Sequence, residues 1–167
     1  MGETLILIPG LACTDRLFEP QISALSTDRT IVVADHRQDD SMEAIAGRLL
    51  KDAPERFALA GLSMGGYAAM EVMRQVPQRV SRLALLDTTS RPDTPEARQN
   101  RERQIALAEA GRFEDTFMTL WPRLVHPDHQ TDKALQDIVF GMMRETGPEA
   151  EAVLHEASLR PRRRIWS

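Results

Sequence analysis

Four short apolar runs, separated by segments with helical spacing, constrain the fold of this chain more than any other feature. The runs are rich in Leu, Ile, Val and Ala and lie at residues 4–10, 30–36, 56–62 and 80–88. None of them alternates apolar with polar residues, which is typical of strands that are buried on both faces of a parallel sheet. Their alternation with helical segments predicts parallel β-α-β units joined by right-handed crossovers.

The segments between the apolar runs carry hydrophobic residues at helical intervals. They cover residues 18–25, 41–53 and 64–76. Ser41 is a candidate N-cap for the second helix, because its hydroxyl can accept a hydrogen bond from a free amide of the first turn. Pro77 ends the third helix.

The character of the chain changes from about residue 91, where a charged stretch leads into helix-like segments. Breaks between these helices are expected at Pro122, Pro127 and the pair Gly147-Pro148, and no strand pattern returns. The expected fold class is therefore α/β, with four parallel strands and flanking helices followed by an all-helical segment. We divide the chain into an α/β part, an all-helical part and an irregular basic tail, at residues 1–90, 91–160 and 161–167.

Composition narrows the class of protein further. The 167 residues are 42% hydrophobic and 28% charged, which describes one ordinary globular domain. A net charge of -4 gives no electrostatic case for binding nucleic acid or an anionic membrane. The single cysteine, Cys13, rules out an intramolecular disulfide and a four-cysteine zinc site. The start lacks the pattern of a secretory signal and no apolar run approaches the ~20 residues of a membrane span, so we expect a cytoplasmic protein.

The most informative motif is Gly61-Leu62-Ser63-Met64-Gly65, a G-x-S-x-G sequence between a predicted strand and a predicted helix. In that context a sharp turn exposes the serine hydroxyl, and glycines are needed on either side to avoid collisions. The helix N-terminus presents free amides and a partial positive charge to a developing oxyanion. Ser63 is therefore a candidate nucleophile; the alternative is a glycine-rich turn with no chemical role.

A second stretch, "LIPGLACTDRLFEPQISAL", ends the first predicted strand at Pro9-Gly10 and leads through a loop into a helix. An oxyanion hole needs a second backbone N–H at this place, and Leu11 is the candidate beside Met64. The alternative is an ordinary turn at the end of a strand.

Taken together, these stretches resemble the α/β-hydrolase family. "LIPGLACTDRLFEPQISAL" is similar to that family's first strand, oxyanion loop and first helix, and "IVVADHRQDDSMEAIAGRLL" to its next strand and helix. "RFALAGLSMGGYAAMEVMRQVPQRVSRLALLDT" is similar to its nucleophile strand, helix and following strand. The helical stretch after Asp87 resembles the cap that small-molecule esterases of this family carry over the active site. The resemblance covers residues 3 to about 158.

The family normally continues past the cap with further strands, whose loops supply the catalytic acid and histidine. This chain departs from the pattern near "SLRPRRRIWS". Two interpretations fit that basic tail: the product of a frameshift or truncated reading frame, and a solvated arginine tail. On the first interpretation the chain is a gene fragment that stops before the usual histidine.

A catalytic base would have to come from one of four histidines. His36 follows the second apolar run, at the carboxyl edge of the predicted sheet and on the correct side; its alternative role is a loop or pocket-lining histidine. His126 and His129 are expected to face solvent or line the cleft, and His155 to lie on the surface.

Asp87 directly follows the fourth predicted strand, in "RLALLD", where some α/β-hydrolases place the triad acid, and is the candidate acid. The alternative is a turn aspartate that bonds the local backbone. Asp35 has a similar position and a weaker case. Cys13 fits a small buried filler better than a second nucleophile.

The resemblance implies a hydrolase that acts on a small carboxylic ester or related acyl compound, without cofactor or metal. Its activity is expected to be impaired here, because the triad histidine is missing. The apolar residues Phe117, Met118, Leu120 and Trp121 either shape a substrate cleft or pack on the sheet. The alternative function is a non-catalytic protein that keeps the fold to bind a ligand or a partner.

The fourth strand would present an unpaired edge, because nothing in the sequence supplies its next neighbour. Its apolar residues are Val80, Leu83, Leu85 and Leu86. Unpaired edges are templates for pairing with another chain, so we expect a marginally stable protein that self-associates through this edge.

Overall fold

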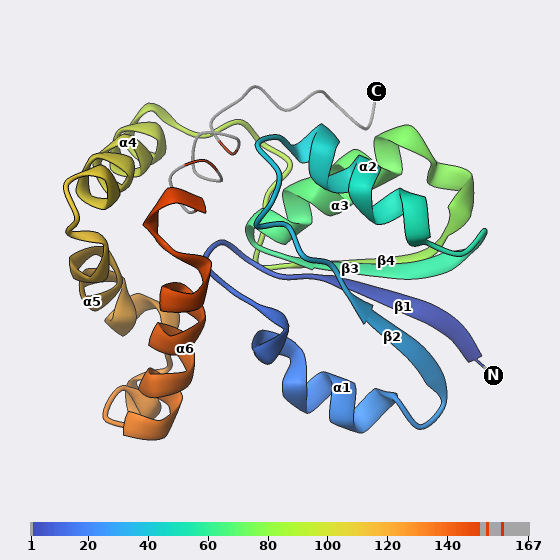
Figure 1. The fold of residues 1–167 in the computed structure, drawn as a ribbon, viewed down its shortest axis with the longest axis horizontal. Coiled ribbons are helices and arrows are strands. Elements are labelled where there is room, and N and C mark those ends of the chain that lie inside the picture. The colour runs from blue at the N-terminus through green and yellow to red at the C-terminus, as the bar shows by residue number, and fades with distance from the viewer. Residues whose placement is uncertain (1, 151–152, 154–157, 159–167) are drawn as a thin grey trace.

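A computed structural model describes residues 2–150, 153 and 158 of the chain. Four strands form one sheet in the order β2-β1-β3-β4, and all neighbouring pairs are parallel. The strands are β1 (Gly2–Ile8), β2 (Arg29–Val33), β3 (Phe57–Leu62) and β4 (Val80–Leu86). The sheet confirms the predicted class of four parallel strands with flanking helices (Figure 1).

Helices cover the two faces of the sheet unequally. On one face lie α2 (Met42–Asp52) and α3 (Met64–Gln75), and on the other lies α1 (Glu19–Leu25), which follows the short 3-10 helix η1 (Asp15–Phe18) (Figure 1). The predicted N-cap of α2 is confirmed, because the Ser41 hydroxyl accepts a hydrogen bond of 3.2 Å from the Ala44 amide. A second 3-10 helix, η2 (Pro77–Arg79), links α3 to β4.

The core lies against both faces of β3. One cluster joins Ile6, Phe57 and Leu59 of the sheet to Ala68 and Val72 of α3. A smaller cluster on the opposite face contains Leu7, Phe18 and Ala60. Parallel strands that are covered on both sides favour continuous apolar runs, and β3 is buried along nearly its whole length.

The edge strands β2 and β4 differ from the expectation of burial on both faces. Val32 is 45% exposed, and Leu85 and Leu86 are 40% and 43% exposed. Within the described residues each of these strands has a neighbour on one side alone. The apolar runs therefore predicted the two edge strands correctly, but the side chains of these strands are less buried than the runs indicated.

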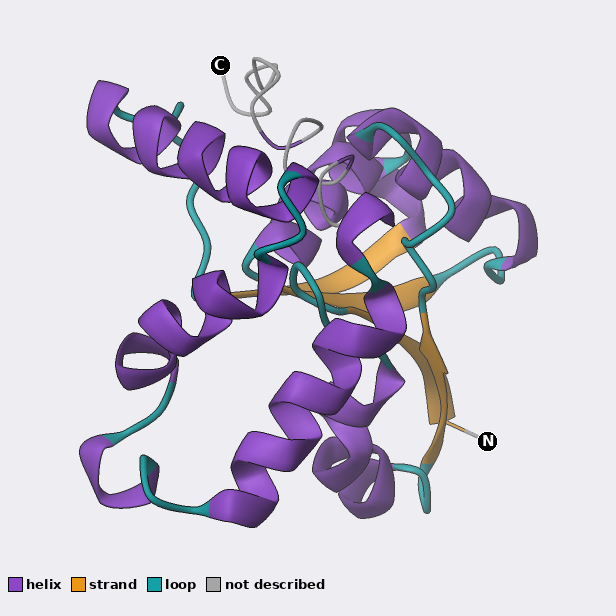
Figure 2. Cartoon of the chain, turned by 60° about the vertical axis from the view of Figure 1, so that its left-hand side comes forward, coloured by secondary structure: helices purple, strands orange, loops and turns teal. Residues whose placement is uncertain are grey.

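The described residues after β4 are helical and lie beside the carboxyl edge of the sheet (Figures 1 and 2). The elements are α4 (Pro95–Glu109), α5 (Phe113–Leu124), the 3-10 helix η3 (Pro127–His129) and α6 (Lys133–Thr146). We refer to residues 91–150 as the helical segment. None of the helices in the described part of the chain is long and apolar enough to cross a membrane.

The expected break at Pro122 is wrong, since α5 continues through this residue to Leu124. A proline removes one amide from the helix and crowds the carbonyl four residues earlier, which is that of Met118. Near the last turn these costs affect few hydrogen bonds, so the helix tolerates them. The break at Gly147 is confirmed, because Gly147 has a φ of 79° directly after α6.

A third cluster of buried side chains holds the helical segment together. Its members are Phe113, Phe117, Trp121, Phe140, Met143, Ala108 and, from the loop after β1, Ala12. The aromatic rings meet edge to face, with centroids 5.7 Å apart for Phe113 and Phe117. Phe117 and Trp121 thus pack in the interior, whereas Met118 is 56% exposed.

Two strand ends fall earlier than predicted. β1 ends at Ile8 and β2 at Val33, so residues 34–36 belong to a loop. The basic tail at 161–167 and His155 lie outside the described residues. The division of the chain at residues 90 and 160 stays a prediction.

Candidate active site

Ser63 occupies a strained position at the turn from β3 to α3. Its φ of 51° and ψ of -115° place it in a region that residues with a side chain seldom adopt. Such strain persists where the surroundings enforce it and is found most often at functional sites. The side chain is exposed, and its hydroxyl makes no hydrogen bond within the part of the chain that the structure describes.

The glycines around Ser63 are required by close backbone contacts. A Cβ at Gly61 would overlap the carbonyl oxygen of Gly65, and a Cβ at Gly65 would overlap the carbonyl oxygens of Ile8 and Pro9. Both partners are backbone atoms that cannot rotate away. The motif therefore brings α3 closer to β1 and β3 than any larger residue would allow.

Two hydrogen bonds connect the backbone of Ser63 to the end of β4 and the loop after it. The amide of Ser63 donates to the carbonyl of Leu86 at 2.9 Å, and the hydroxyl of Thr88 donates to the carbonyl of Ser63 at 2.7 Å. Thr88 also packs on Gly66, where an added Cβ would lie 2.5 Å from the threonine side chain. Sequence reasoning did not single out Thr88, whose only signal is its position just after a strand.

The loop after β1 reaches the same corner as Ser63. A Cβ added to Gly10 would lie 3.6 Å from the Cβ of Ser63 and 3.5 Å from the carbonyl of Leu62. In the order β2-β1-β3-β4 the chain leaves β1 toward one side and β3 toward the other, so the point where the strand order reverses lies between their carboxyl ends. Ligands of open α/β sheets bind at such a point.

The two candidate oxyanion donors lie at the carboxyl ends of these two strands. Leu11 lies in the turn after β1, and Met64 is the first residue of α3. The amides of a first helical turn have no acceptor inside the helix. Within residues 2–150 neither the Leu11 amide nor the Met64 amide donates a hydrogen bond to a backbone carbonyl outside the helices and strands.

Ala12 anchors the loop that carries Leu11. It has a φ of 55° and is 2% exposed, inside the cluster formed by Phe113, Phe117 and Trp121. The Cys13 amide closes the turn by donating to the carbonyl of Gly10 at 3.2 Å. The helical segment therefore packs directly on the loop beside Ser63.

Asp87 lies next to the elbow but is not bonded to it. It directly follows β4 and has a φ of 42°. Its neighbours in the chain, Leu86 and Thr88, each form a hydrogen bond with the backbone of Ser63. Its side chain is exposed, and among the described residues its carboxylate forms neither a hydrogen bond nor an ion pair. Asp87 therefore does not form the hydrogen bonds to the local backbone that a turn aspartate would form.

His36 lies in the loop after β2 and is 1% exposed. Burial lowers its pKa from 6.5 to about 4, against the opposing charges of Asp35 and Asp39. No hydrogen bond joins it to Ser63 within the described residues, and both ring nitrogens are buried, with the Ala34 backbone opposing the lowering of its pKa. Asp35, the weaker acid candidate, is paired with Arg37 at 2.8 Å.

None of the remaining candidates is joined to Ser63 by a hydrogen bond within the described residues. His126 and His129 are exposed on η3, where Nδ1 of His126 accepts from the Asp128 amide at 3.3 Å. Burial raises the pKa of the Cys13 thiol to about 11, so the thiolate is scarce at neutral pH and the residue acts as a filler.

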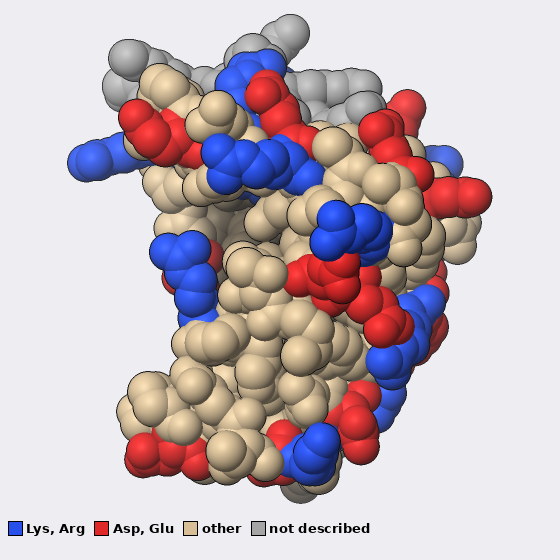
Figure 3. Space-filling view, turned by 90° about the vertical axis from the view of Figure 1, so that its left-hand side faces the viewer, with Lys and Arg blue, Asp and Glu red and all other residues tan. Residues whose placement is uncertain are grey.

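The face of the molecule formed by the helical segment is hollowed, and much of its surface carries neither Lys or Arg nor Asp or Glu (Figure 3). Charged side chains stand around this area, at its upper, right-hand and lower edges and on its left flank.

No family model matches the chain. It is 30% identical over 144 residues to the "Putative carbamate hydrolase RutD" of Rhizobium rhizogenes, which covers 75% of this chain and 53% of the relative. It is 32% identical over 91 residues to the pimeloyl-acyl-carrier-protein methyl ester esterase of Vibrio parahaemolyticus, which covers 49% of this chain and 35% of that protein. The chain thus spans about half, or less, of the length of these curated relatives.

Solved structures match over nearly all of the chain. A thermophilic esterase from Thermogutta terrifontis superposes with a TM-score of 0.81 at 23% identity, over 96% of this chain and 64% of that one. The enol-lactonase from Burkholderia xenovorans gives 0.82 at 21% identity, over 97% and 66%. Together with the four-stranded parallel sheet, these comparisons confirm the resemblance, and the chain has the α/β-hydrolase fold.

Proposed function

We propose that this chain carries the nucleophile and oxyanion half of a serine hydrolase that acts on a small carboxylic ester or related acyl compound. The observation that carries the proposal is the positive φ of Ser63 between β3 and α3, where the side chain is exposed at a turn that Gly61 and Gly65 allow to pack tightly. The curated relatives support hydrolysis in general, since their names describe a carbamate hydrolase and a methyl ester esterase.

In the proposed reaction Oγ of Ser63 attacks the carbonyl carbon and the carbonyl oxygen becomes an oxyanion. The amides of Leu11 and Met64 donate to that oxygen, and the positive end of α3 stabilises its charge. Collapse of the intermediate breaks the bond to the alcohol oxygen, which leaves as the alcohol with the proton from Ser63. Water then attacks the acyl-serine, which releases the acid and restores the hydroxyl.

The proton transfers determine the rate. We propose Asp87 as the acid and His36 as the base, but the buried, hard-to-protonate imidazole of His36 is a weak proton acceptor. Loss of the histidine from a serine triad lowers turnover by about 10⁶, with roughly 10³–10⁴ over water remaining from the oxyanion hole and binding. Ester turnover by this chain is therefore expected to be slow.

The experiment combines a fluorophosphonate probe with a p-nitrophenyl short-chain ester. Labelling of the wild-type chain and release of p-nitrophenol, both abolished in Ser63→Ala, would support the proposal. Ser26→Ala is the matched control, because Ser26 is an exposed serine after α1. The proposal fails if the folded wild type gives neither labelling nor turnover above the Ser63→Ala background.

A second candidate is a protein that binds an acyl compound without converting it. It is favoured by the lack of contact between Ser63 and any histidine in the described residues. Calorimetric titration with ethyl butyrate distinguishes the two functions. Equal binding to wild type and Ser63→Ala without hydrolysis supports the binding function, and hydrolysis by the wild type alone overturns it.

A further inference from the structure

The outer edge of β2 has no neighbouring strand. Within the described residues β2 pairs with β1 alone, and it forms one margin of the sheet β2-β1-β3-β4. The amide of Ala34 donates to the carbonyl of Leu7 in β1 at 2.9 Å. Backbone groups alternate in direction along a strand, so the amides and carbonyls of Ile31 and Val33 face away from β1. They form a short row of donors and acceptors that another strand can use.

The composition of β2 leaves this edge unprotected. Edge strands are commonly blocked by lysine, proline or a bulge. β2 reads Arg-Thr-Ile-Val-Val, without lysine or proline, and its register with β1 is regular from Ile31 to Val33. Val32, near its centre, is 45% exposed. The edge therefore combines unpaired backbone groups with an exposed apolar side chain.

A cavity lies beside Val32, between β2 and α2. It has a volume of about 190 Å³, and its lining includes the apolar side chains of Val32, Ile45 and Leu49. The charged residue Arg48 at this cavity is bonded to Asp39 at 2.8 Å. An apolar side chain on the same face of a neighbouring strand would shield this cavity and Val32 from water.

A second copy of β2 fits this edge in an antiparallel orientation around a two-fold axis. In an antiparallel ladder, hydrogen-bonded pairs join residues whose backbone groups both face the shared edge. Ile31 therefore pairs with the partner's Val33, and Val33 pairs with the partner's Ile31. Val32 then lies directly opposite the partner's Val32, on the face that carries the cavity.

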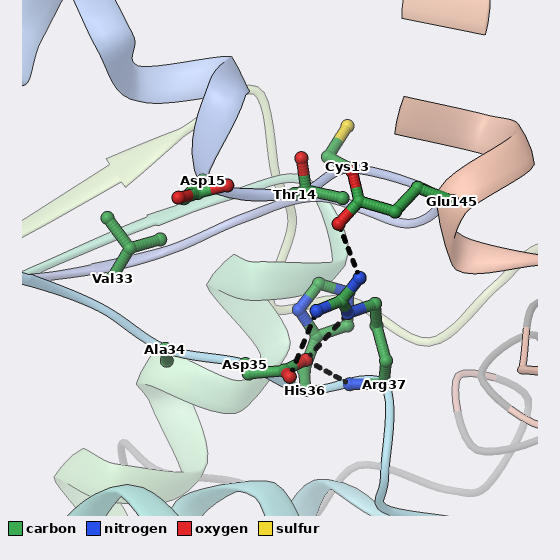
Figure 4. Close-up of a pocket in the computed structure, with 9 residues that line it drawn as sticks. All are labelled: Cys13, Thr14, Asp15, Val33, Ala34, Asp35, His36, Arg37 and Glu145. Carbon is green, nitrogen blue, oxygen red and sulfur yellow. Dashed lines mark hydrogen bonds and ion pairs between the residues drawn. The ribbon is translucent and has the colours of Figure 1, made fainter. Parts of the chain in front are cut away.

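Charge distinguishes this register from its neighbours. Arg29 lies opposite the partner's Asp35, and the symmetry repeats this contact of opposite charges. A shift of the strands by two residues would oppose Arg29 to the partner's Arg37 in one direction and to the partner's Val33 in the other. Asp35 lies just after the end of β2 and already pairs with Arg37 at 2.8 Å (Figure 4). A carboxylate has enough acceptor sites for a second guanidinium.

We propose that two copies of this chain associate through their β2 edges, with Val32 at the two-fold axis. The same patch serves both copies, so the contact is isologous and closes as a dimer. One strand of five residues gives a small interface, and we expect weak association, with a dissociation constant in the micromolar range or above. The β4 edge takes no part, because β4 lies at the opposite margin of the sheet.

A cysteine at the two-fold axis tests the pairing. Opposite residues of a non-hydrogen-bonded antiparallel pair have their Cα atoms about 4.5 Å apart, which a disulfide can span. Val32→Cys should therefore form a disulfide-linked dimer with oxidised glutathione, visible on a non-reducing gel. Thr30→Cys is the matched control, because Thr30 is also exposed but lies opposite the partner's Ala34 in this register. The wild type reports the background from Cys13, the single native cysteine. Equal crosslinking of the two variants, or crosslinking of Val32→Cys no faster than that of the wild type, would overturn the proposal.

Sedimentation velocity measures the association without a crosslink. The exposed β4 edge is first blocked with Leu85→Lys, so that β2 remains as the available edge. This chain should reach a dimer and no larger species as its concentration rises, and adding Val32→Lys should return it to a monomer. Adding Leu124→Lys, at a 56% exposed position of α5, or Ser63→Ala should leave the dimer unchanged, so the test is independent of hydrolysis. A folded Leu85→Lys chain that remains monomeric would show the proposal to be wrong.

Arg29→Glu measures the contribution of charge. It sets like charges against Asp35 at two symmetric positions and should weaken the dimer about tenfold. Arg123→Glu, an equal change of charge at an exposed position of α5, is the control. If the two folded variants have the same dissociation constant, the proposed pairing is wrong.

Discussion

The hydroxyl of Thr88 donates a 2.7 Å hydrogen bond to the backbone carbonyl of Ser63. Together with the bond from the Ser63 amide to Leu86, it ties the strained turn to the end of β4. The candidate nucleophile is thus held by the neighbouring strand as well as by its own glycines.

Thr88→Val is expected to loosen this turn. The Ser63 carbonyl still accepts from the Gly66 amide, so the loss should be moderate, about 1 kcal/mol in the free energy of unfolding. Fluorophosphonate labelling of Ser63 should slow as well, because the serine is then less restrained. Urea unfolding and labelling time courses measure the two effects. Thr30→Val, at an exposed strand position, is the control, and equal labelling rates in the two variants would contradict the role of Thr88.

Two glycine-to-alanine changes should have opposite effects. Gly65→Ala forces a Cβ onto the backbone oxygens of Ile8 and Pro9, so it should destabilise the fold by more than about 3 kcal/mol. Gly47→Ala, within α2, meets no atom within 4 Å and should stabilise by about 0.5–1 kcal/mol. Thermal unfolding compares both with the wild type. A Gly65→Ala protein as stable as the wild type would show that the elbow is not tightly packed.

Acid should destabilise the protein through His36. Its folded pKa of about 4 lies below the usual 6.5, so between these values the unfolded chain binds a proton that the folded chain does not. The stability contributed by neutral His36 is present above pH 6.5 and is lost as the pH falls toward 4, by roughly 3 kcal/mol. Urea unfolding at pH 7 and pH 4 should show a smaller difference in His36→Gln than in the wild type. An unchanged difference would contradict the burial of this imidazole.

The exposed edge strand should drive self-association. Leu85 and Leu86 of β4 are 40% and 43% exposed, and within the described residues β4 pairs with β3 alone. Analytical ultracentrifugation should show concentration-dependent association of the wild type that Leu85→Lys reduces, because edge lysines block pairing. Leu124→Lys, at a 56% exposed position at the end of α5, is the matched control. A monodisperse wild-type monomer with one cooperative thermal transition would overturn this prediction.

The elbow was predictable because its signal is local. Gly61, Ser63 and Gly65 lie within five residues, between an apolar run and a helical pattern, and each has a reason that depends on the turn itself. The sheet was predictable for a similar reason, since long apolar runs of β-branched and aliphatic residues mark strands whatever their neighbours.

The roles of Thr88 and Ala12 were not predictable, because each depends on segments that are distant in sequence. Thr88 meets Ser63 across 25 residues, and Ala12 meets aromatic residues about a hundred positions later. The sequence also places His36 at the correct edge of the sheet, but its burial results from packing that no local pattern reports.

The position of Ala12 affects any attempt to shorten this protein. A chain cut at residue 90 would keep every strand, yet it would remove Phe113, Phe117 and Trp121 from around Ala12. The loop that positions the Leu11 amide would then lose the packing that holds its left-handed turn. In engineering terms, the sheet cannot be separated from the helical segment as an independent catalytic scaffold.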